Sequence, residues 1–168
     1  WRYNMNFGNT FTKVASFAKA VASRGITNKK TDVFTKKLRV ISCFGDSCIS
    51  GELPPCEHLK NSKAAGKFYC GGCGCGDRKA TWLVSDANEY SKLDYPKLSC
   101  PLKMPGFTDY EISSAEESIS PITRRYYIEQ LKDTHIDKVP VSDNEMPEDI
   151  KKKLEKALEN NKSKPEND

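Results

Sequence analysis

The stretch Cys70-Gly71-Gly72-Cys73-Gly74-Cys75-Gly76 places three thiols within six residues of this 168-residue chain. Two residues between Cys70 and Cys73 let both sulfurs point into one tetrahedral site. The glycines allow positive φ and expose backbone N–H groups to the sulfurs, which is typical of a metal knuckle. The stretch lies in a block that holds all seven cysteines: Cys43, Cys48, Cys56, Cys70, Cys73, Cys75 and Cys100. We therefore expect the fold to form around a thiol-bound metal.

A metal explains this block better than a disulfide framework does. The number of cysteines is odd, and the start, Trp1-Arg2-Tyr3-Asn4, has no signal-peptide pattern. Thiols on a tight glycine turn converge on one point, which suits a metal ion better than three outward bridges. A closed zinc site with four thiolate ligands is the leading interpretation. An iron–sulfur cluster would use the same thiols, although its familiar spacings differ, and disulfides or free thiols are the remaining reading.

The knuckle supplies two ligands, and the others must come from elsewhere in the block. Cys43 ends a predicted helix, Cys56 follows Pro54-Pro55, and Cys100 precedes Pro101. In each case the helix end or the proline restricts the backbone and so fixes the direction of the cysteine side chain. The candidate ligands are Cys70, Cys73, Cys43, Cys56, Cys100 and Cys75.

Three further side chains leave the number of sites open. Cys75 would bridge two metals, serve a second site or stay free. Cys48 ranks lowest because its loop has no directing device. His58 is either an eighth ligand, which would suffice for two tetrahedral zinc sites, or a surface side chain beside Glu57.

The hydrophobic pattern around the block predicts helical arms. Apolar and small residues recur at helical spacing over 10–24, and a second helix begins at Thr31 or Asp32 with Phe34, Leu38 and Ile41 on one face. A strand over 38–41 is the alternative for part of this segment. Residues 67–69 and 81–84 are short strand candidates that would form a ribbon beside the knuckle.

Beyond the block, the chain predicts two more helices. Ser120-Pro121 starts a helix over 121–132, Pro147 opens the last helix, and the end from Asn160 is expected to fray. Residues 109–120 and 133–146 are expected to be linkers. The fold class is therefore α+β and irregular, with an N-terminal arm (1–42), a metal-binding module (43–108) and a C-terminal arm (109–168).

Charge is distributed unevenly although the net charge is only +4. Residues 1–42 carry nine basic side chains and one acidic side chain, whereas residues 109–150 carry four basic and eleven acidic. A nucleic-acid contact through residues 13–39 is one interpretation of the basic end. The favoured one is that the basic residues fold against the chain's own acidic groups or are solvated.

The remaining motifs exclude several classes of function. The chain has no P-loop, no dinucleotide fingerprint and no His-Glu-x-x-His motif, and its two histidines form no Ser-His-Asp arrangement. Thiols in a knuckle are occupied by metal rather than free for catalysis, so we expect no enzyme. The longest apolar runs fall short of 18 residues, so we expect no contact with a membrane.

The pattern over roughly residues 14–107 resembles a family of small cysteine-rich proteins of phages and bacteria. The matching residues are Leu38-Arg39, Cys43, Cys56, His58, Cys70-Gly71-Gly72-Cys73-Gly74-Cys75, Lys79 and Cys100-Pro101-Leu102-Lys103. This chain has Met104 where the family often has tryptophan, and an insertion containing Cys48 separates the first two thiols. The resemblance implies metal binding and a phage setting, with the protein in the cytoplasm of the infected cell or in the virion, but it supplies no reaction.

The sequence thus predicts a non-enzymatic zinc-binding protein that docks onto a larger assembly such as a virion. A nucleic-acid-binding zinc module and an iron–sulfur electron-transfer protein are the alternatives. The thin hydrophobic fraction (37%) is consistent with a fold that a metal stabilises.

Overall fold

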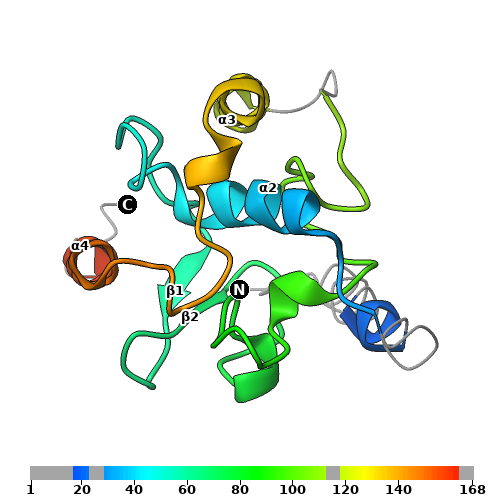
Figure 1. Ribbon diagram of the computed structural model, residues 1–168, viewed down its shortest axis with the longest axis vertical. Helices are drawn as coiled ribbons and strands as arrows, with labels where there is room; N and C mark the ends of the chain where they lie inside the picture. Colours follow the sequence, from blue (N-terminus) through cyan, green and yellow to red (C-terminus); the bar gives the residue numbers. More distant parts are fainter. Residues whose placement is uncertain (1–16, 23–28, 113–117, 163–168) are drawn as a thin grey trace, which may run out of the picture.

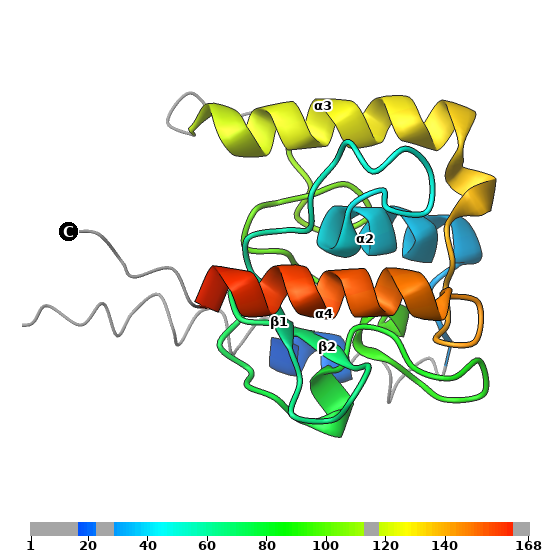
Figure 2. The same cartoon turned by 90° about the vertical axis from the view of Figure 1, so that its left-hand side faces the viewer.

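The computed structural model describes residues 17–22, 29–112 and 118–162, and its fold is mixed α+β and irregular, as the sequence predicts. A central helix, α2, has α3 on one side and a β-hairpin with α4 on the other (Figures 1 and 2). The helices are α2 (Val33–Phe44), α3 (Ile119–Thr134) and α4 (Glu148–Lys162), and residues 17–22 are also helical. The strands are β1 (Leu59–Asn61) and β2 (Phe68–Cys70), and the short 3-10 helices are η1 (Lys79–Thr81), η2 (Lys92–Asp94) and η3 (Ile136–Lys138).

Helix α2 forms where the sequence predicts it. The side chain of Asp32 accepts a hydrogen bond from the backbone N–H of Thr35 at 2.8 Å, which satisfies one of the free donors at the helix start. The helix ends at Gly45, whose φ of 78° favours glycine. The helical prediction for residues 38–41 is confirmed, and Cys43 lies in the last turn. Phe34, Leu38 and Ile41 share one face of the helix as predicted, with Leu38 and Ile41 buried and Phe34, in the first turn, 48% exposed.

The ribbon beside the knuckle forms with a different partner strand. β2 confirms the strand predicted at 67–69, shifted by one residue, and it pairs antiparallel with β1 so that Leu59 lies opposite Cys70. The segment 81–84 is not a strand, since Thr81 belongs to η1 and only an isolated bridge joins Tyr69 to Trp82. β1 escaped prediction because it is three residues long and has no run of β-branched or aromatic side chains.

The C-terminal helices extend beyond their predicted bounds. α3 begins at Ile119 with Ser118 as its cap residue, so Ser120 stands inside the first turn rather than before it. The predicted linker 133–146 contains the end of α3 and all of η3. α4 confirms the last helix and continues to Lys162, so fraying from Asn160 is wrong for residues 160–162. The rest of the helix predicted over 10–24, and the end of the chain after 162, lie outside the described residues.

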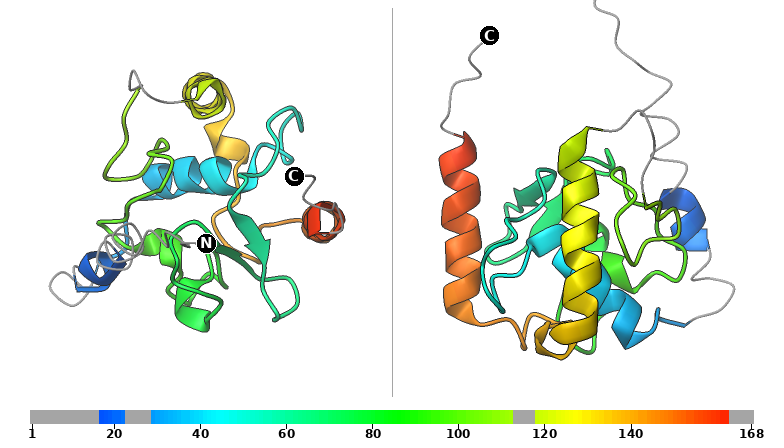
Figure 3. Two further views of the ribbon diagram at one scale, coloured as in Figure 1. Left: turned by 180° about the vertical axis from the view of Figure 1, so that it is seen from behind. Right: turned by 90° about the horizontal axis from the view of Figure 1, so that it is seen from above.

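The two C-terminal helices pack on the rest of the chain. α3 contacts α2, and α4 contacts β1. The two helices run in opposite directions (Figures 2 and 3). Their buried anchors are Ile128 and Leu131 in α3 and Ile150, Leu154 and Leu158 in α4. The connection between them, residues 135–147, passes from the α3 side of α2 to the side where α4 lies (Figure 1).

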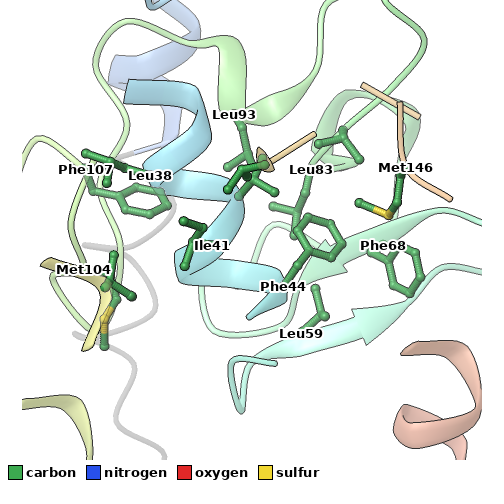
Figure 4. Close-up of a cluster of buried hydrophobic side chains, with 14 of the residues drawn as sticks. Leu38, Ile41, Phe44, Leu59, Phe68, Leu83, Leu93, Met104, Phe107 and Met146 are labelled. Atoms are coloured by element: carbon green, nitrogen blue, oxygen red, sulfur yellow. The ribbon is translucent and has the colours of Figure 1, made fainter. Parts of the chain in front are cut away.

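One hydrophobic core draws on all three predicted segments of the chain. Along α2, Leu38 lies near Phe107 and Met104 on one side, and Phe44 lies near Phe68 of the hairpin and Met146 on the other (Figure 4). Burying a large aliphatic or aromatic side chain stabilises the fold by about 2 kcal/mol. The core is therefore built from long-range contacts around α2.

A buried arginine ties the loop after η2 to α2. Arg39 is 2% exposed and donates to the carbonyl oxygens of Leu93 (2.9 Å), Tyr95 (2.6 Å) and Gly106 (2.7 Å). Gly106 has a φ of 90°, and a Cβ there would lie 2.9 Å from Cβ of Leu38, so only glycine allows this approach. A buried cation needs such partners. The loop held in this way contains Cys100.

Within the described residues, none of the helices is both long enough and apolar enough to cross a membrane.

Candidate metal centre

The thiols arrive from four parts of the fold, and backbone hydrogen bonds join three of these parts. Cys43 closes α2, and its carbonyl oxygen accepts from the N–H of Cys56 at 2.9 Å. The carbonyl oxygen of His58 accepts from the N–H of Gly71 at 2.7 Å, which places the knuckle beside the Cys56 segment. Cys70 ends β2 opposite Leu59. The end of α2, the Cys56 segment and the knuckle are therefore held next to one another.

One sulfur of the knuckle accepts a backbone N–H from the residue two positions further along. The N–H of Cys75 lies 3.4 Å from Sγ of Cys73. Hydrogen bonds to a sulfur favour its thiolate form, which is the form that binds metals. At Cys56 and Cys100 burial raises the pKa, and nearby backbone N–H groups (of His58, and of Leu102 and Met104) oppose that rise.

The sulfurs of Cys43, Cys56 and Cys100 interact electrostatically. Burial is the main cause that raises the pKa of Cys43, and the neighbouring Cys56 and Cys100 raise it further. Burial raises the pKa of Cys100 to about 11, with Cys56 adding to the effect. Each thiolate disfavours the next because like charges lie close together. These three thiols therefore face a common region.

Cys70 links this region to the knuckle. Its pKa is raised first by its hydrogen bond with Cys73, then by burial and by the proximity of Cys43. Cys75 has a pKa raised to about 11 by burial and by its hydrogen bond with Cys73. The candidate ligands thus form two groups that share Cys70: Cys43, Cys56, Cys70 and Cys100 in one, and Cys70, Cys73 and Cys75 in the other.

A buried lysine pairs with the central thiol of the knuckle. Nζ of Lys92 donates to Sγ of Cys73 at 2.8 Å, and Lys92 is 4% exposed. The pKa of Cys73 is lowered to about 4, first by its hydrogen bond with Cys70 and then by Lys92. Burial, the largest single effect, would lower the pKa of Lys92, but the charge and hydrogen bond of Cys73 together with the nearby Cys70 and Cys75 outweigh it, and the pKa of Lys92 is raised. Cys73 is accordingly a thiolate at neutral pH.

An arginine from α3 supplies the second cation. The pKa of Arg124 is lowered by burial, which the charges of Cys56, Cys43 and Cys100 oppose. Its guanidinium donates to the carbonyl oxygen of Ser42 at 2.8 Å and to that of Pro54 at 2.5 Å. The sequence did not predict a role for Arg124 or Lys92, because nothing in their local pattern separates them from the other basic residues. Lys92 is identified by its burial and its contact with Cys73, and Arg124 by its bonds to the backbone next to Cys43 and Cys56.

Two of the side chains that the sequence left open, Cys48 and His58, stand outside both groups of thiols. Cys48 lies apart from them, and His58 lies beside the knuckle. Cys48 lies in an apolar pocket near Met146 and Ile150, and its pKa is raised by burial and by Asp149 and Asp46. Nε2 of His58 lies 3.8 Å from the Glu57 carboxylate. The ring of His58 rests on the knuckle, because a Cβ at Gly72 would lie 2.7 Å from it. Lys79, which the family resemblance picks out, is exposed and pairs with Glu89.

All seven cysteines are free thiols. Within residues 17–22, 29–112 and 118–162, no three Cys, His, Asp or Glu side chains are close enough together to hold a metal ion as they stand. The thiols are therefore gathered into one region without forming a closed ligand set.

Several basic residues of the N-terminal arm contact the chain itself. Lys36 forms an ion pair with Asp94 at 2.7 Å, and Lys37 donates to the carbonyl oxygen of Asp137. Lys30 donates to the carbonyl oxygen of Glu89, and Arg39 is buried. These contacts agree with the view that the basic residues fold against the rest of the chain, while residues 13–16 and 23–28 lie outside the described part.

No protein-family model matches the chain, and no curated protein and no solved structure matches it either. The resemblance to cysteine-rich phage and bacterial proteins therefore stays a prediction.

Proposed function

We propose that this chain is a non-enzymatic zinc-binding protein whose thiols hold the metal as a structural staple. The observation that carries the proposal is the geometry at the centre of the knuckle: Sγ of Cys73 accepts from Nζ of Lys92 at 2.8 Å and lies 3.4 Å from the N–H of Cys75. Hydrogen bonds around a metal's ligands orient them and tune their charge. These contacts favour the thiolate form of Cys73, which is the form that binds a metal.

Charge balance supports the same conclusion. Four thiolates around Zn²⁺ leave a net charge of about −2. The cations of Lys92 and Arg124 lie beside the two thiol groups and offset that charge. Since the thiols do not form a closed set as they stand, the proposal requires them to draw closer when the ion binds.

Docking onto a larger assembly is the second part of the proposal. Large apolar side chains are exposed on and beside α3: Ile112 (77%), Ile119 (80%) and Tyr126 (66%). Ile112 and Tyr126 also line one shallow hollow with Ile122. Apolar groups gathered in this way are typical of protein contacts rather than of surfaces that face only water. The phage or virion setting rests on the family resemblance alone.

Elemental analysis of the full chain, purified without oxygen, tests the metal. We expect zinc in a stoichiometric amount and a colourless protein. Iron with visible absorbance would support the iron–sulfur alternative instead, and protein without any metal would contradict both. Nucleic-acid binding through residues 13–39 would show as an affinity that falls steeply with salt.

A matched pair of variants tests the ligands. Cys56→Ser should lose the metal and much of its stabilisation, which is on the order of 10 kcal/mol for a complete thiolate site. Cys48→Ser changes a cysteine of the same block that lies away from the thiol groups, so it should keep the metal. Equal metal content in the two variants would show that Cys56 is not a ligand.

A further inference from the structure

Helix α3 holds the backbone of each segment that carries Cys43, Cys56 or Cys100. It crosses one side of α2 (Figure 2). Three of its side chains make the contacts, and we call Arg124, Arg125 and Tyr127 the latch residues. They are within four positions of one another, so a single turn of helix reaches all of these segments.

Arg124 joins the Cys43 segment to the Cys56 segment. Its Nη2 lies 2.8 Å and its Nε 3.2 Å from the carbonyl oxygen of Ser42, the residue before Cys43. Its Nη1 lies 2.5 Å from the carbonyl oxygen of Pro54, two residues before Cys56. The planar guanidinium fork fixes the two carbonyl groups relative to each other.

Arg125 reaches the Cys100 segment. It is 1% exposed, and its Nε lies 3.1 Å from the carbonyl oxygen of Lys103. It also donates to the carbonyl oxygen of Leu102. Both acceptors lie within three residues of Cys100, so Arg125 fixes the backbone of the Cys100 segment.

Tyr127 holds the loop between Cys43 and Cys56. Its hydroxyl donates to Oδ2 of Asp46 at 2.9 Å. Oδ1 of the same carboxylate accepts from the N–H of Leu53 at 2.6 Å, and Asp46 is 1% exposed. This contact closes the loop that sets the distance between the two thiols.

We infer that α3 is a latch whose docking is coupled to metal binding: the ion fixes the sulfurs of Cys43, Cys56 and Cys100, and the latch residues fix the peptide groups beside them. The inference rests on the proposed function. Metal binding and the docking of α3 each order these segments, so whichever happens first reduces the loss of conformational freedom in the other. The two effects are reciprocal: bound metal must favour docking of α3 by the same factor by which docked α3 raises the affinity for metal.

Hydrogen exchange on the unaltered full chain tests the latch directly. Backbone amides of α3 should exchange about ten-fold faster after a chelator removes zinc, a typical size for coupling between two sites. α4 serves as the internal reference because it packs on β1 and carries none of the latch residues. If α3 and α4 lose protection equally, or if α3 does not change, the latch is overturned.

Zinc affinity of variants tests the reverse direction. Arg124→Ala should weaken binding of zinc, added as the metal alone, on the order of ten-fold. Arg124→Lys keeps the charge but loses the fork, so its affinity should fall between those of Arg124→Ala and the parent. Lys152→Ala removes one exposed positive charge from α4 and should bind like the parent. Equal affinities for Arg124→Ala and Lys152→Ala would contradict the latch.

The two proposals fail in different ways. A chain that never binds metal contradicts the zinc function. A chain that binds zinc while the exchange of α3 stays constant keeps the zinc function and loses only the latch.

Discussion

Nζ of Lys92 lies 2.8 Å from Sγ of Cys73, at a place where only 4% of the lysine is exposed. A buried ammonium group without a partner costs several kcal/mol, and so does a buried thiolate. Each group therefore depends on the other. η2 presents the lysine and the glycine turn presents the thiol, so the contact joins two segments that lie about twenty residues apart in the chain.

Removing this lysine should destabilise the protein strongly. Lys92→Met keeps the length and apolar stem of the side chain but leaves the Cys73 thiolate unpaired, and breaking a buried pair typically costs about 3 kcal/mol. Urea unfolding of the metal-free, reduced protein at pH 7 measures the loss. Lys79→Met removes an exposed lysine that pairs with Glu89 and should change the stability by less than about 0.5 kcal/mol. Similar losses for the two variants would contradict the importance of the buried pair.

The same pair predicts a pH dependence in the metal-free state. The pKa of Cys73 is about 4 in the folded protein, whereas an unperturbed cysteine has a pKa of about 8.5. The unfolded chain therefore binds more protons between these values, and the contribution of Cys73 to stability rises with pH over this window. It is lost as the pH falls through 4. Unfolding midpoints at pH 5 and pH 8 should differ in the parent, and Cys73→Ser should reduce the difference.

Asp32, the N-cap residue of α2, should tolerate replacement by another capping residue with little loss of stability, but not replacement by alanine. Asp32→Ala removes the acceptor for the N–H of Thr35 and should cost about 1 kcal/mol, whereas Asp32→Asn keeps an acceptor and should cost less. The pKa of Asp32 is lowered first by its hydrogen bond with the Thr35 side chain. Its contribution is therefore present above pH 4 and lost in acid. Thermal melts at pH 7 distinguish the two variants, and equal melts would show that the cap contributes nothing.

Two glycines with a similar positive φ should respond differently to alanine. Gly45 and Gly51 have φ of 78° and 74°. A Cβ at Gly45 would lie 2.3 Å from the carbonyl oxygen of Leu53, whereas a Cβ at Gly51 would meet nothing within 4 Å. Gly51→Ala should therefore cost about 1 kcal/mol for the left-handed backbone alone, and Gly45→Ala should cost clearly more. Chemical denaturation measures both, and equal losses would contradict the close approach at Gly45.

The sequence predicted those helices that have a capping residue and helical spacing within their own residues. The cap at Asp32 and the helical spacing of Leu38 and Ile41 were sufficient for α2, because both signals act within one or two turns. The β1 strand gave no such signal, since three residues form a strand only when a partner lies alongside. Phe34 shows a related limit: spacing places it on the same helix face as Leu38 and Ile41, but only the neighbouring segments decide that this face is covered at Leu38 and Ile41 and open at Phe34.

The candidate site likewise has a part that the sequence predicts and a part that depends on long-range contacts. The turn at Cys70 and Cys73 is recognisable from two-residue spacing and glycine, because its geometry is set by the intervening backbone. The long-range partners were inferred as a set, and the structure adds how they are grouped: Cys43, Cys56 and Cys100 interact with one another, while Cys48 lies in an apolar pocket.

The sequence by itself determined the α+β class and the position of α2 with Cys43 in its last turn. Only the tertiary structure decided that Lys92 is buried against Cys73 and that Arg124 bonds the backbone next to Cys43 and Cys56, while Lys79 faces solvent. The physical reason is that a helix forms from signals within one or two turns of chain. The burial and partners of a lysine or arginine depend on segments that are distant in sequence and meet only in the folded protein.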